Sequence, residues 1–420
     1  MQVADILSKG KSSWLNEDPF GRKVLSLVND PLIFKMTPSR LREVRWDLIR
    51  SSLDFFSSHS PYYADLFDRL EIKPSNVTQS DLVRLAIPSD MLRGEGQRRF
   101  LINKVEEGGQ TFTSSGTTGK DPVRVYRSPF DLMLMLRANT DLFEHVYGNE
   151  LKQGQGVALL MAAKELADKL SFVAFVDMTL ENKGIELIYG MDVEESEDGK
   201  PWLHLKANRD RLLEFLKSKK EPKLFFSAPA GVHLLGKKLE EMPLRKRMMM
   251  KAATGAPPID LGRGGAVVTG GGSKGMSDLP SHDLIVSKGQ ALFKSRDEKG
   301  KRDAPFMDVL GMTETLTALI DMAGVRAKLP HPLSEVMVVD PRSFEPIEEE
   351  GKEGLLVIFN PFVTSWLECF YPGDIMSTAP SNSFYGREFK YSRRLTVKEG
   401  WTMQRACGGS LEEMMQEESK

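Results

Sequence analysis

A segment rich in hydroxyl groups and glycine near residue 115 combines residue types that bind phosphate. It consists of Thr113, Ser114, Ser115, Gly116, Thr117, Thr118, Gly119 and Lys120. The glycines bring the backbone close to a ligand without a Cβ atom in the way, the hydroxyls donate hydrogen bonds, and the closing lysine adds a positive charge. We therefore expect this loop to bind a polyphosphate.

Two other interpretations of this loop fit less well. A flexible linker of this composition usually continues in glycine and serine, whereas this segment stops at a lysine and is flanked by apolar residues. A Walker loop needs four residues between its first glycine and a Gly-Lys-Ser/Thr end. Here Gly116 stands only three positions before Gly119, and Asp121 follows Lys120.

Further motifs follow downstream in an order that is informative as a whole. They are the Gly-rich turn Thr269-Gly270-Gly271-Gly272-Ser273, the segment Gly311-Met312-Thr313-Glu314, the connection through Asp340-Pro341, residues 348–351 and residues 354–358, and Tyr371-Pro372-Gly373-Asp374. Together with the loop at 113–120 they resemble, in type and order, the motifs of the adenylate-forming superfamily. That superfamily includes acyl-CoA synthetases, luciferases and acyl-protein synthetases. The resemblance covers the chain from about residue 100 onward.

The resemblance implies a site for ATP, Mg²⁺ and a carboxylic acid. The 113–120 loop would hold the β- and γ-phosphates, Thr313 would contact the α-phosphate, Glu314 would help hold Mg²⁺, and Asp374 would accept the ribose hydroxyls. Gly271, Gly272, Gly311, Met312 and Arg393 complete the implied nucleotide site, with Lys120, Thr313 and Glu314 as its catalytic residues. Taken singly, Thr313 also fits a helix N-cap and Asp374 an ordinary turn.

Three departures from the superfamily pattern stand out. Leu310 occupies the position of the usual aromatic residue, Asp121 separates Lys120 from Pro122, and the sequence ends at residue 420, 46 positions after Asp374. A complete acyl-CoA synthetase has a longer C-terminal lid with a catalytic lysine, and no such lysine motif fits here. The shortened lid resembles the acyl-protein synthetase branch, which includes the synthetase subunit of the bacterial bioluminescence fatty acid reductase.

In that branch a cysteine near the C-terminus accepts the acyl group, and Cys407 stands at the matching place. Gly408 and Gly409 give its segment mobility, and Ser410 with Glu413 forms a capping box that predicts a short helix just after it. A helix N-terminus and the nearby Arg405 both favour a thiolate. The alternative is a buried structural thiol, which is the interpretation we favour for Cys369 in its aromatic surroundings.

These features predict an ATP-dependent ligase that forms an acyl-AMP from a fatty or aromatic acid and passes the acyl group to a thiol. The acceptor would be Cys407, a partner protein such as a reductase or carrier, or CoA. An acid–CoA or acid–amine ligase of secondary metabolism is the alternative enzyme. A nucleotide-binding protein without catalysis is the alternative of another class.

Composition is consistent with such an enzyme and excludes other classes. The net charge is −2 and the basic residues are evenly spread, so we expect no nucleic-acid partner. There is no apolar run of membrane-spanning length and no signal-peptide core, which predicts a cytoplasmic protein without a membrane span. The two cysteines and six scattered histidines predict no disulfide framework and no metal cluster.

The alternation of helical and strand patterns predicts an α/β fold. Helices are expected after Thr37-Pro38, from Ser128-Pro129 to Gly148, and over 208–216. Buried parallel strands are expected at Val157–Ala162, Phe172–Met178, Leu224–Ser227, Ala266–Thr269, Val336–Val339 and Leu355–Phe359, and a solvated turn at Arg296–Arg302. By resemblance, residues 1–375 form the large N-terminal domain of the adenylate-forming fold and residues 376–420 a vestigial C-terminal segment. The acid pocket would involve Ala228–Leu235 and Gly270–Gly275.

Overall fold

The computed structural model describes residues 2–102, 106–114, 121–148, 150–194, 205–271, 279–321 and 327–395. The α-helices are α1 Val3–Lys11, α2 Pro19–Val28, α3 Pro38–His59, α4 Pro61–Arg69, α5 Gln79–Leu85, α6 Pro129–Tyr147, α7 Ser171–Asn182, α8 Arg209–Lys217, α9 Pro229–Glu241, α10 Leu244–Thr254 and α11 His282–Leu292. The strands are β1 Ile87–Pro88, β2 Gln110–Thr113, β3 Arg124–Arg127, β4 Val157–Leu160, β5 Glu186–Tyr189, β6 Met191–Val193, β7 Leu205–Ala207, β8 Lys223–Ser227, β9 Ile259–Arg263, β10 Ala266–Gly270, β11 Phe293–Asp297, β12 Gly300–Asp303, β13 Phe306–Leu310, β14 Leu319–Asp321, β15 Lys328–Leu329, β16 Glu335–Val339, β17 Gly354–Phe359, β18 Cys369–Tyr371, β19 Asp374–Pro380 and β20 Arg387–Arg394.

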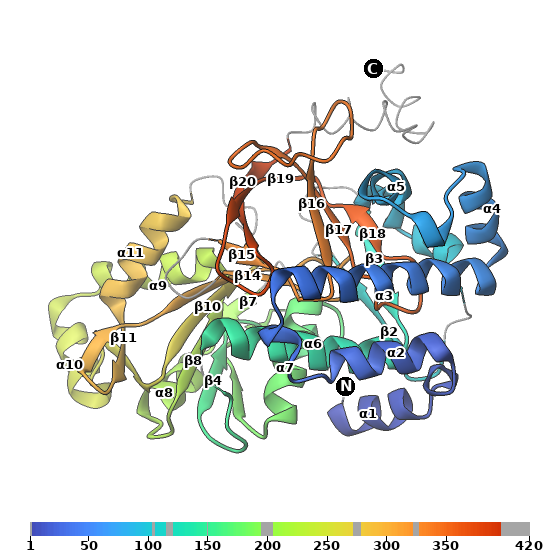
Figure 1. The fold of residues 1–420 in the computed structure, drawn as a ribbon. Helices are drawn as coiled ribbons and strands as arrows, with labels where there is room; N and C mark the ends of the chain where they lie inside the picture. The colour runs from blue at the N-terminus through green and yellow to red at the C-terminus, as the bar shows by residue number, and fades with distance from the viewer. Residues whose placement is uncertain are drawn as a thin grey trace, which may run out of the picture.

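One large mixed sheet runs through the molecule, and its strands pair parallel in one half and antiparallel in the other (Figure 1). Strands β5, β4, β8, β10 and β13 lie side by side and are all parallel. Beyond β13 the sheet continues through β14, β15, β20, β19 and β17, and each of these pairings is antiparallel. Strand β13 is therefore the boundary between a parallel half and an antiparallel half.

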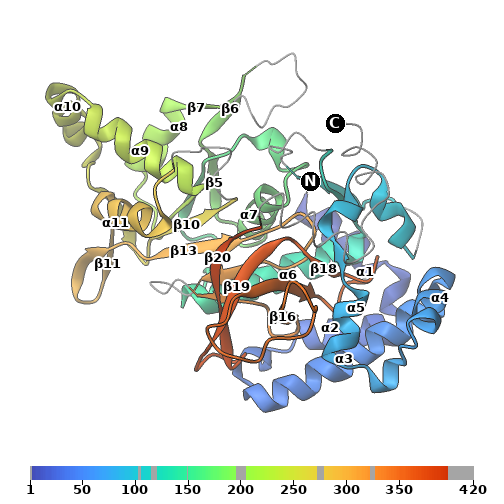
Figure 2. The same cartoon turned by 90° about the horizontal axis from the view of Figure 1, so that it is seen from above.

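Helices cover both faces of the parallel half, which is why its strands are apolar on both faces. On one face, alternate residues such as Ala158 and Val268 pack into the core that contains α6 and α7. On the other, Leu159 and Val267 pack into a second core with α8, α9 and α11. Figure 2 shows α9, α10 and α11 grouped at one end of the molecule and α3, α4 and α5 beside the antiparallel strands at the other.

The central helix α6 begins and ends where its sequence predicts. The Ser128 hydroxyl accepts a hydrogen bond from the Asp131 backbone N–H at 3.1 Å, Pro129 occupies the first turn, and Gly148 ends the helix with a φ of 73°. Helices α3 and α8 likewise begin close to where they were predicted, and Thr37 and Asn208 are their N-caps. The α/β prediction is confirmed.

One predicted strand is wrong. Residues 172–178 lie in helix α7, not in a strand. Because α7 is enclosed between α6 and strands β4 and β5, it is apolar on several sides, including Val173, Phe175 and Val176. A short continuous apolar run does not distinguish a buried helix from a buried strand.

The predicted direction of the last two strands is also wrong. Strands β16 and β17 exist close to the predicted ranges, but they pair antiparallel, with Val336 opposite Ile358. Their continuous apolar sequence reports burial on both faces, and in this protein that burial occurs in the antiparallel half. The predicted turn at 296–302 is the exposed tip of the β11–β12 hairpin.

Strands β19 and β20 pair into the large sheet, so the compact body includes residues up to Arg394. The division of the chain at about residue 375 stays a prediction. No helix in the described ranges is both long enough and apolar enough to cross a membrane.

Candidate active site

Two of the predicted motifs leave the sheet at neighbouring positions. Strand β10 ends at Gly270 and strand β13 at Leu310, and Gly270 pairs with Val309. The Gly271 turn, with a φ of 84°, and the segment that begins at Gly311 therefore start side by side. Ligands of open α/β sheets bind outside the carboxyl ends of parallel strands, so this edge is where a nucleotide site is expected.

The predicted phosphate loop is carried by the β2–β3 hairpin. Thr113 pairs with Arg124, and its backbone N–H donates to the Lys169 carbonyl at 2.8 Å. The Ser114 hydroxyl accepts a hydrogen bond from the Val123 backbone N–H at 2.9 Å, which closes the base of the loop. Ser115, Gly116, Thr117, Thr118, Gly119 and Lys120, and also Gly272 and Cys407, lie outside the described residues.

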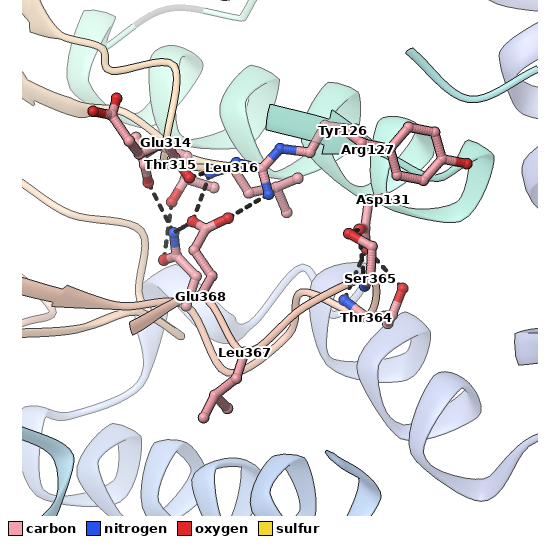
Figure 3. Close-up of polar contacts among 12 residues, drawn as sticks. Tyr126, Arg127, Asp131, Glu314, Thr315, Leu316, Thr364, Ser365, Leu367 and Glu368 are labelled. Atoms are coloured by element: carbon pink, nitrogen blue, oxygen red, sulfur yellow. Dashed lines mark hydrogen bonds and ion pairs between the residues drawn. The ribbon is translucent and has the colours of Figure 1, made fainter. Parts of the chain in front are cut away.

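Thr313 and Glu314 are buried, at 9% and 7% exposure, in an irregular segment between β13 and β14. No helix begins at Thr313, which excludes the N-cap interpretation. The Glu314 carboxylate makes no hydrogen bond to another described residue, and Figure 3 shows it pointing away from the neighbouring Arg127 and Glu368. It is therefore available to a ligand.

A network of buried side chains holds the backbone around this motif (Figure 3). Arg127, the last residue of β3, forms an ion pair with Glu368, and the side chains are 1% and 0% exposed. The second terminal nitrogen of Arg127 donates to the Glu314 carbonyl at 2.6 Å, and Glu368 Oε1 accepts from the Leu316 N–H at 2.7 Å. Burial raises the pKa of Glu368, while Arg127 opposes that shift.

Asp374 is the first residue of β19 and follows Gly373, whose φ is 86°. It is therefore a strand residue and not a turn residue, and it is only 2% exposed. Its Oδ2 has no hydrogen-bond partner in the part of the chain that the structure describes, and its Oδ1 lies 4.0 Å from the Arg394 guanidinium. A buried unpaired acceptor costs about 1–3 kcal/mol, so this oxygen fits a hydroxyl donor of a ligand.

The electrostatics of Asp374 place it close to the other acidic residue of the motifs. Burial raises the pKa of its carboxyl group, and Glu314 contributes to this shift, whereas Arg394 and Lys328 lower the pKa. Glu314 and Asp374 are 60 residues apart in the sequence, yet in the fold they are near enough for the charge of Glu314 to raise the pKa of Asp374.

A buried charge cluster at the same edge was not predicted from the sequence. The Lys328 ammonium on β15 donates to Asp308 Oδ2 on β13 at 2.9 Å and to Asp321 Oδ1 on β14 at 2.8 Å. The Thr269 hydroxyl on β10 donates to Asp308 Oδ1 at 2.6 Å. Lys328 and the other groups lower the pKa of Asp308 below its ordinary value although burial opposes them. The available signal was a lysine within a mostly apolar stretch, residues 327–333.

The positions of the remaining predicted residues do not by themselves indicate a role. Leu310, at the position of the missing aromatic residue, is half-buried and packs on the core. Phe172 of α7 lies against Gly270, where an added Cβ atom would be 2.9 Å from its ring. Gly311 and Met312 are half-buried, and Arg393 is exposed on β20 opposite Ile375. Their predicted roles stay predictions.

The fold and the site can now be set against known proteins. No family model and no curated protein matches this chain. An open conformation of 2-hydroxyisobutyryl-CoA ligase in complex with 2-HIB-AMP and CoA matches 88% of this chain and 79% of its own, with a TM-score of 0.58 and 13% identity. The same ligase in the postadenylation state with 2-HIB-AMP matches 87% of this chain and 68% of its own, with a TM-score of 0.57 and 14% identity.

The chain has the adenylate-forming fold. At these low identities the likeness establishes the architecture, and the chemistry has to be argued from the residues of this chain. Within that fold, the motifs at 113, 271, 311–314 and 374 are the ones that the sequence assigned to a nucleotide.

The residues present are compatible with Mg²⁺. No cluster of three or more His, Cys, Asp or Glu side chains suited to a metal occurs among the described residues. Mg²⁺ is nevertheless commonly bound by one or two carboxylates together with phosphate oxygens and water. The uncommitted Glu314 carboxylate fits that pattern, and bound Mg²⁺ would neutralise charge on the phosphates.

Proposed function

We propose that this protein is an ATP- and Mg²⁺-dependent ligase that activates a carboxylic acid as an acyl-adenylate and transfers the acyl group to a thiol. The observation that carries the proposal is the buried Asp374 carboxylate, whose Oδ2 has no hydrogen-bond partner among the described residues and whose pKa is raised by burial and by Glu314. A folded protein rarely retains such a group at a structural position, because the desolvated oxygen costs free energy. A ribose hydroxyl would satisfy it.

In the first half-reaction, a carboxylate oxygen of the acid attacks the α-phosphorus of ATP. A P–O bond to the acid forms, the bond between the α-phosphorus and the bridging oxygen breaks, and pyrophosphate leaves. The role of this chain is to orient and neutralise. The 113–120 loop with Lys120 would hold the departing phosphates, Thr313 would donate to the α-phosphate, and Glu314 would help hold Mg²⁺.

In the second half-reaction, a thiolate attacks the acyl carbon, a C–S bond forms, and AMP leaves. Our preferred acceptor is Cys407, carried by the segment 376–420, with subsequent transfer to a partner reductase or carrier. The inertness of Cys369 supports this choice: it is 1% exposed, its thiol donates to the Leu82 carbonyl at 3.2 Å, and burial raises its pKa. A thiol in that environment is not a nucleophile.

CoA is the second candidate acceptor. It is favoured by the solved ligase structure of similar fold, which contains CoA together with 2-HIB-AMP. Both candidates share the first half-reaction and differ only in the second.

The first half-reaction is tested by pyrophosphate exchange into ATP with a panel of fatty, hydroxy and aromatic acids. Exchange that depends on one class of acid supports the proposal. ATP binding without exchange for any acid would support a catalytically inactive nucleotide-binding protein instead.

The acceptor is tested by the mass of the intact protein after incubation with ATP, Mg²⁺ and the active acid. A hydroxylamine-labile acyl group that disappears in Cys407→Ser, with exchange unchanged, supports acyl transfer to the protein. Efficient acylation of free CoA by a protein that is never acylated would assign the chain to the acid–CoA ligases.

A further inference from the structure

The ion pair between Arg127 and Glu368 joins the hairpin that carries the 113–120 loop to the segment around Glu314. The proposed chemistry needs these two parts at a fixed position relative to each other. Arg127 ends β3, the strand that follows the 113–120 loop, and the same hairpin pairs Thr113 with Arg124. Through its donation to the Glu314 carbonyl at 2.6 Å, Arg127 links that hairpin directly to the residue proposed to hold Mg²⁺.

Several hydrogen bonds to buried side chains hold the segment after Glu314. Leu316 N–H donates to Glu368 at 2.7 Å, and the Leu316 carbonyl accepts from Asn139 Nδ2 at 2.8 Å. Asn139 Oδ1 in turn accepts from the Ala318 N–H at 2.9 Å. Asn360 donates to the Thr315 hydroxyl at 2.8 Å and also to Glu368.

A buried ion pair is a weak source of stability, since desolvation offsets much of its attraction and apolar replacements are often as stable. Its value here lies in geometry. The planar guanidinium presents several donors in fixed directions, so one arginine bonds the Glu368 carboxylate and the Glu314 carbonyl at the same time. A lysine presents a single ammonium at the end of a flexible chain.

We propose that Arg127 and Glu368 are positioning residues that fix Glu314 relative to the phosphate loop and thereby set the dependence of the reaction on Mg²⁺ and ATP. The proposal rests on the proposed adenylation function for its kinetic consequence. Its structural consequence, a rigid 314–318 segment, is independent of that function.

The chain contains a matched control pair. Arg45 of α3 donates to Glu335 Oε2 at 2.6 Å and to the Pro332 carbonyl at 3.2 Å, and the side chains are 6% and 1% exposed. It therefore repeats the arrangement of one arginine, one buried carboxylate and one backbone carbonyl, but none of these groups belongs to a predicted site motif.

The experiment compares Arg127→Lys with Arg45→Lys in the full chain. Each variant keeps the positive charge beside its carboxylate and loses the fixed second donor. We expect Arg127→Lys to raise the Mg²⁺ concentration for half-maximal pyrophosphate exchange by about 10- to 100-fold, the usual effect of removing a group that orients a metal ligand. Arg45→Lys should leave this concentration unchanged. It should lower the melting temperature about as much as Arg127→Lys does.

Amide hydrogen exchange of the peptide that spans 311–318 provides a readout that needs no activity. It should speed up in Arg127→Lys and in Glu368→Gln and stay unchanged in Arg45→Lys. If wild type shows no pyrophosphate exchange with any acid, the adenylation function fails while this comparison still tests the positioning role. Equal amide exchange in Arg127→Lys, Glu368→Gln and Arg45→Lys, or an unchanged Mg²⁺ requirement in an active Arg127→Lys, would overturn the proposal.

Discussion

The two halves of the large sheet supply different kinds of groups to the same edge. The parallel half ends in glycine turns and a hydroxyl, Gly270, Gly271 and Thr269, so it offers mainly backbone. The antiparallel half contributes buried charges, Asp321, Lys328 and Asp374. Glu314 lies in the connection that crosses from β13 of one half to β14 of the other.

This difference reflects how the two halves are built. Parallel strands are sandwiched between helices, and their carboxyl ends open into loops. Antiparallel neighbours bring side chains from adjacent strands directly opposite each other, which suits ion pairs such as that of Asp321 and Lys328. We infer that the parallel half offers mainly backbone groups, whereas the fixed charges lie in the antiparallel half and, through Asp308, on the boundary strand β13.

The largest effect that would sharpen this comparison is on stability. Lys328→Met should lower the free energy of unfolding by about 3–5 kcal/mol, because it leaves the Asp308 and Asp321 carboxylates without their cation. The matched lysine of the parallel half is Lys223 on β8, whose ammonium donates to the Leu216 carbonyl at 3.0 Å and to no other residue that the structure describes. Lys223→Met should cost about 1 kcal/mol. Similar losses in denaturant unfolding would contradict the contrast.

The next effect concerns the connection between the halves. Glu314→Gln should lower the rate of pyrophosphate exchange about 10- to 1000-fold, as expected for one preorganised electrostatic contact, and Lys120→Ala should do the same. Glu43→Gln is the control, since this exposed residue of α3 pairs with Arg40 and lies outside all of the motifs. Normal exchange in both Glu314→Gln and Lys120→Ala would remove them from the site.

A smaller effect tests the ribose contact of the antiparallel half. Wild type should prefer ATP over 2′-deoxy-ATP, because the deoxy analogue leaves the buried Asp374 acceptor without a hydrogen bond. Asp374→Ala removes that acceptor and should narrow the preference by about 1–3 kcal/mol. The measurement is kcat/KM for both nucleotides. Unchanged discrimination in the variant would show that Asp374 does not contact the 2′-hydroxyl.

The smallest effect is a pH dependence in the antiparallel half. His331 follows β15 and is 1% exposed, and burial lowers its pKa from 6.5 to about 3. A neutral imidazole is thus favoured in the folded state, so its contribution to stability is complete above pH 6.5 and is lost as the pH falls toward 3. The loss should approach about 1.4 kcal/mol per pH unit.

The check is a series of unfolding measurements between pH 6.5 and 5. His331→Asn, whose side-chain oxygen can accept the Leu333 N–H as Nδ1 does at 3.3 Å, should be less sensitive to acid over this range. An identical slope in wild type and variant would assign the acid sensitivity to other groups.

The sequence predicted those features that depend on neighbouring residues. The ends of α6 followed from Ser128, Pro129 and Gly148, and β8 and β10 followed from short apolar runs. The α/β class followed from the alternation of such elements. The motif residues Thr313, Glu314 and Asp374 were singled out because each belongs to a short local pattern, and their roles stay predictions.

The sequence did not predict features that depend on distant contacts. Arg127 and Glu368 are 241 residues apart, and neither belongs to a motif, so nothing local indicated their pairing. Lys328 is similar, since its two aspartates come from separate strands. Residues 172–178 were assigned to a strand because only the tertiary structure shows that the run is enclosed by α6 and the sheet.

The burial of Cys369 has a practical consequence for chemistry done on this protein. The chain has two cysteines, and Cys369 is the one within the described residues, enclosed and with a raised pKa. A thiol reagent applied to the folded protein at neutral pH should therefore leave Cys369 unmodified. Cys369 therefore does not have to be replaced before a fluorophore or spin label is attached at a cysteine elsewhere in the chain.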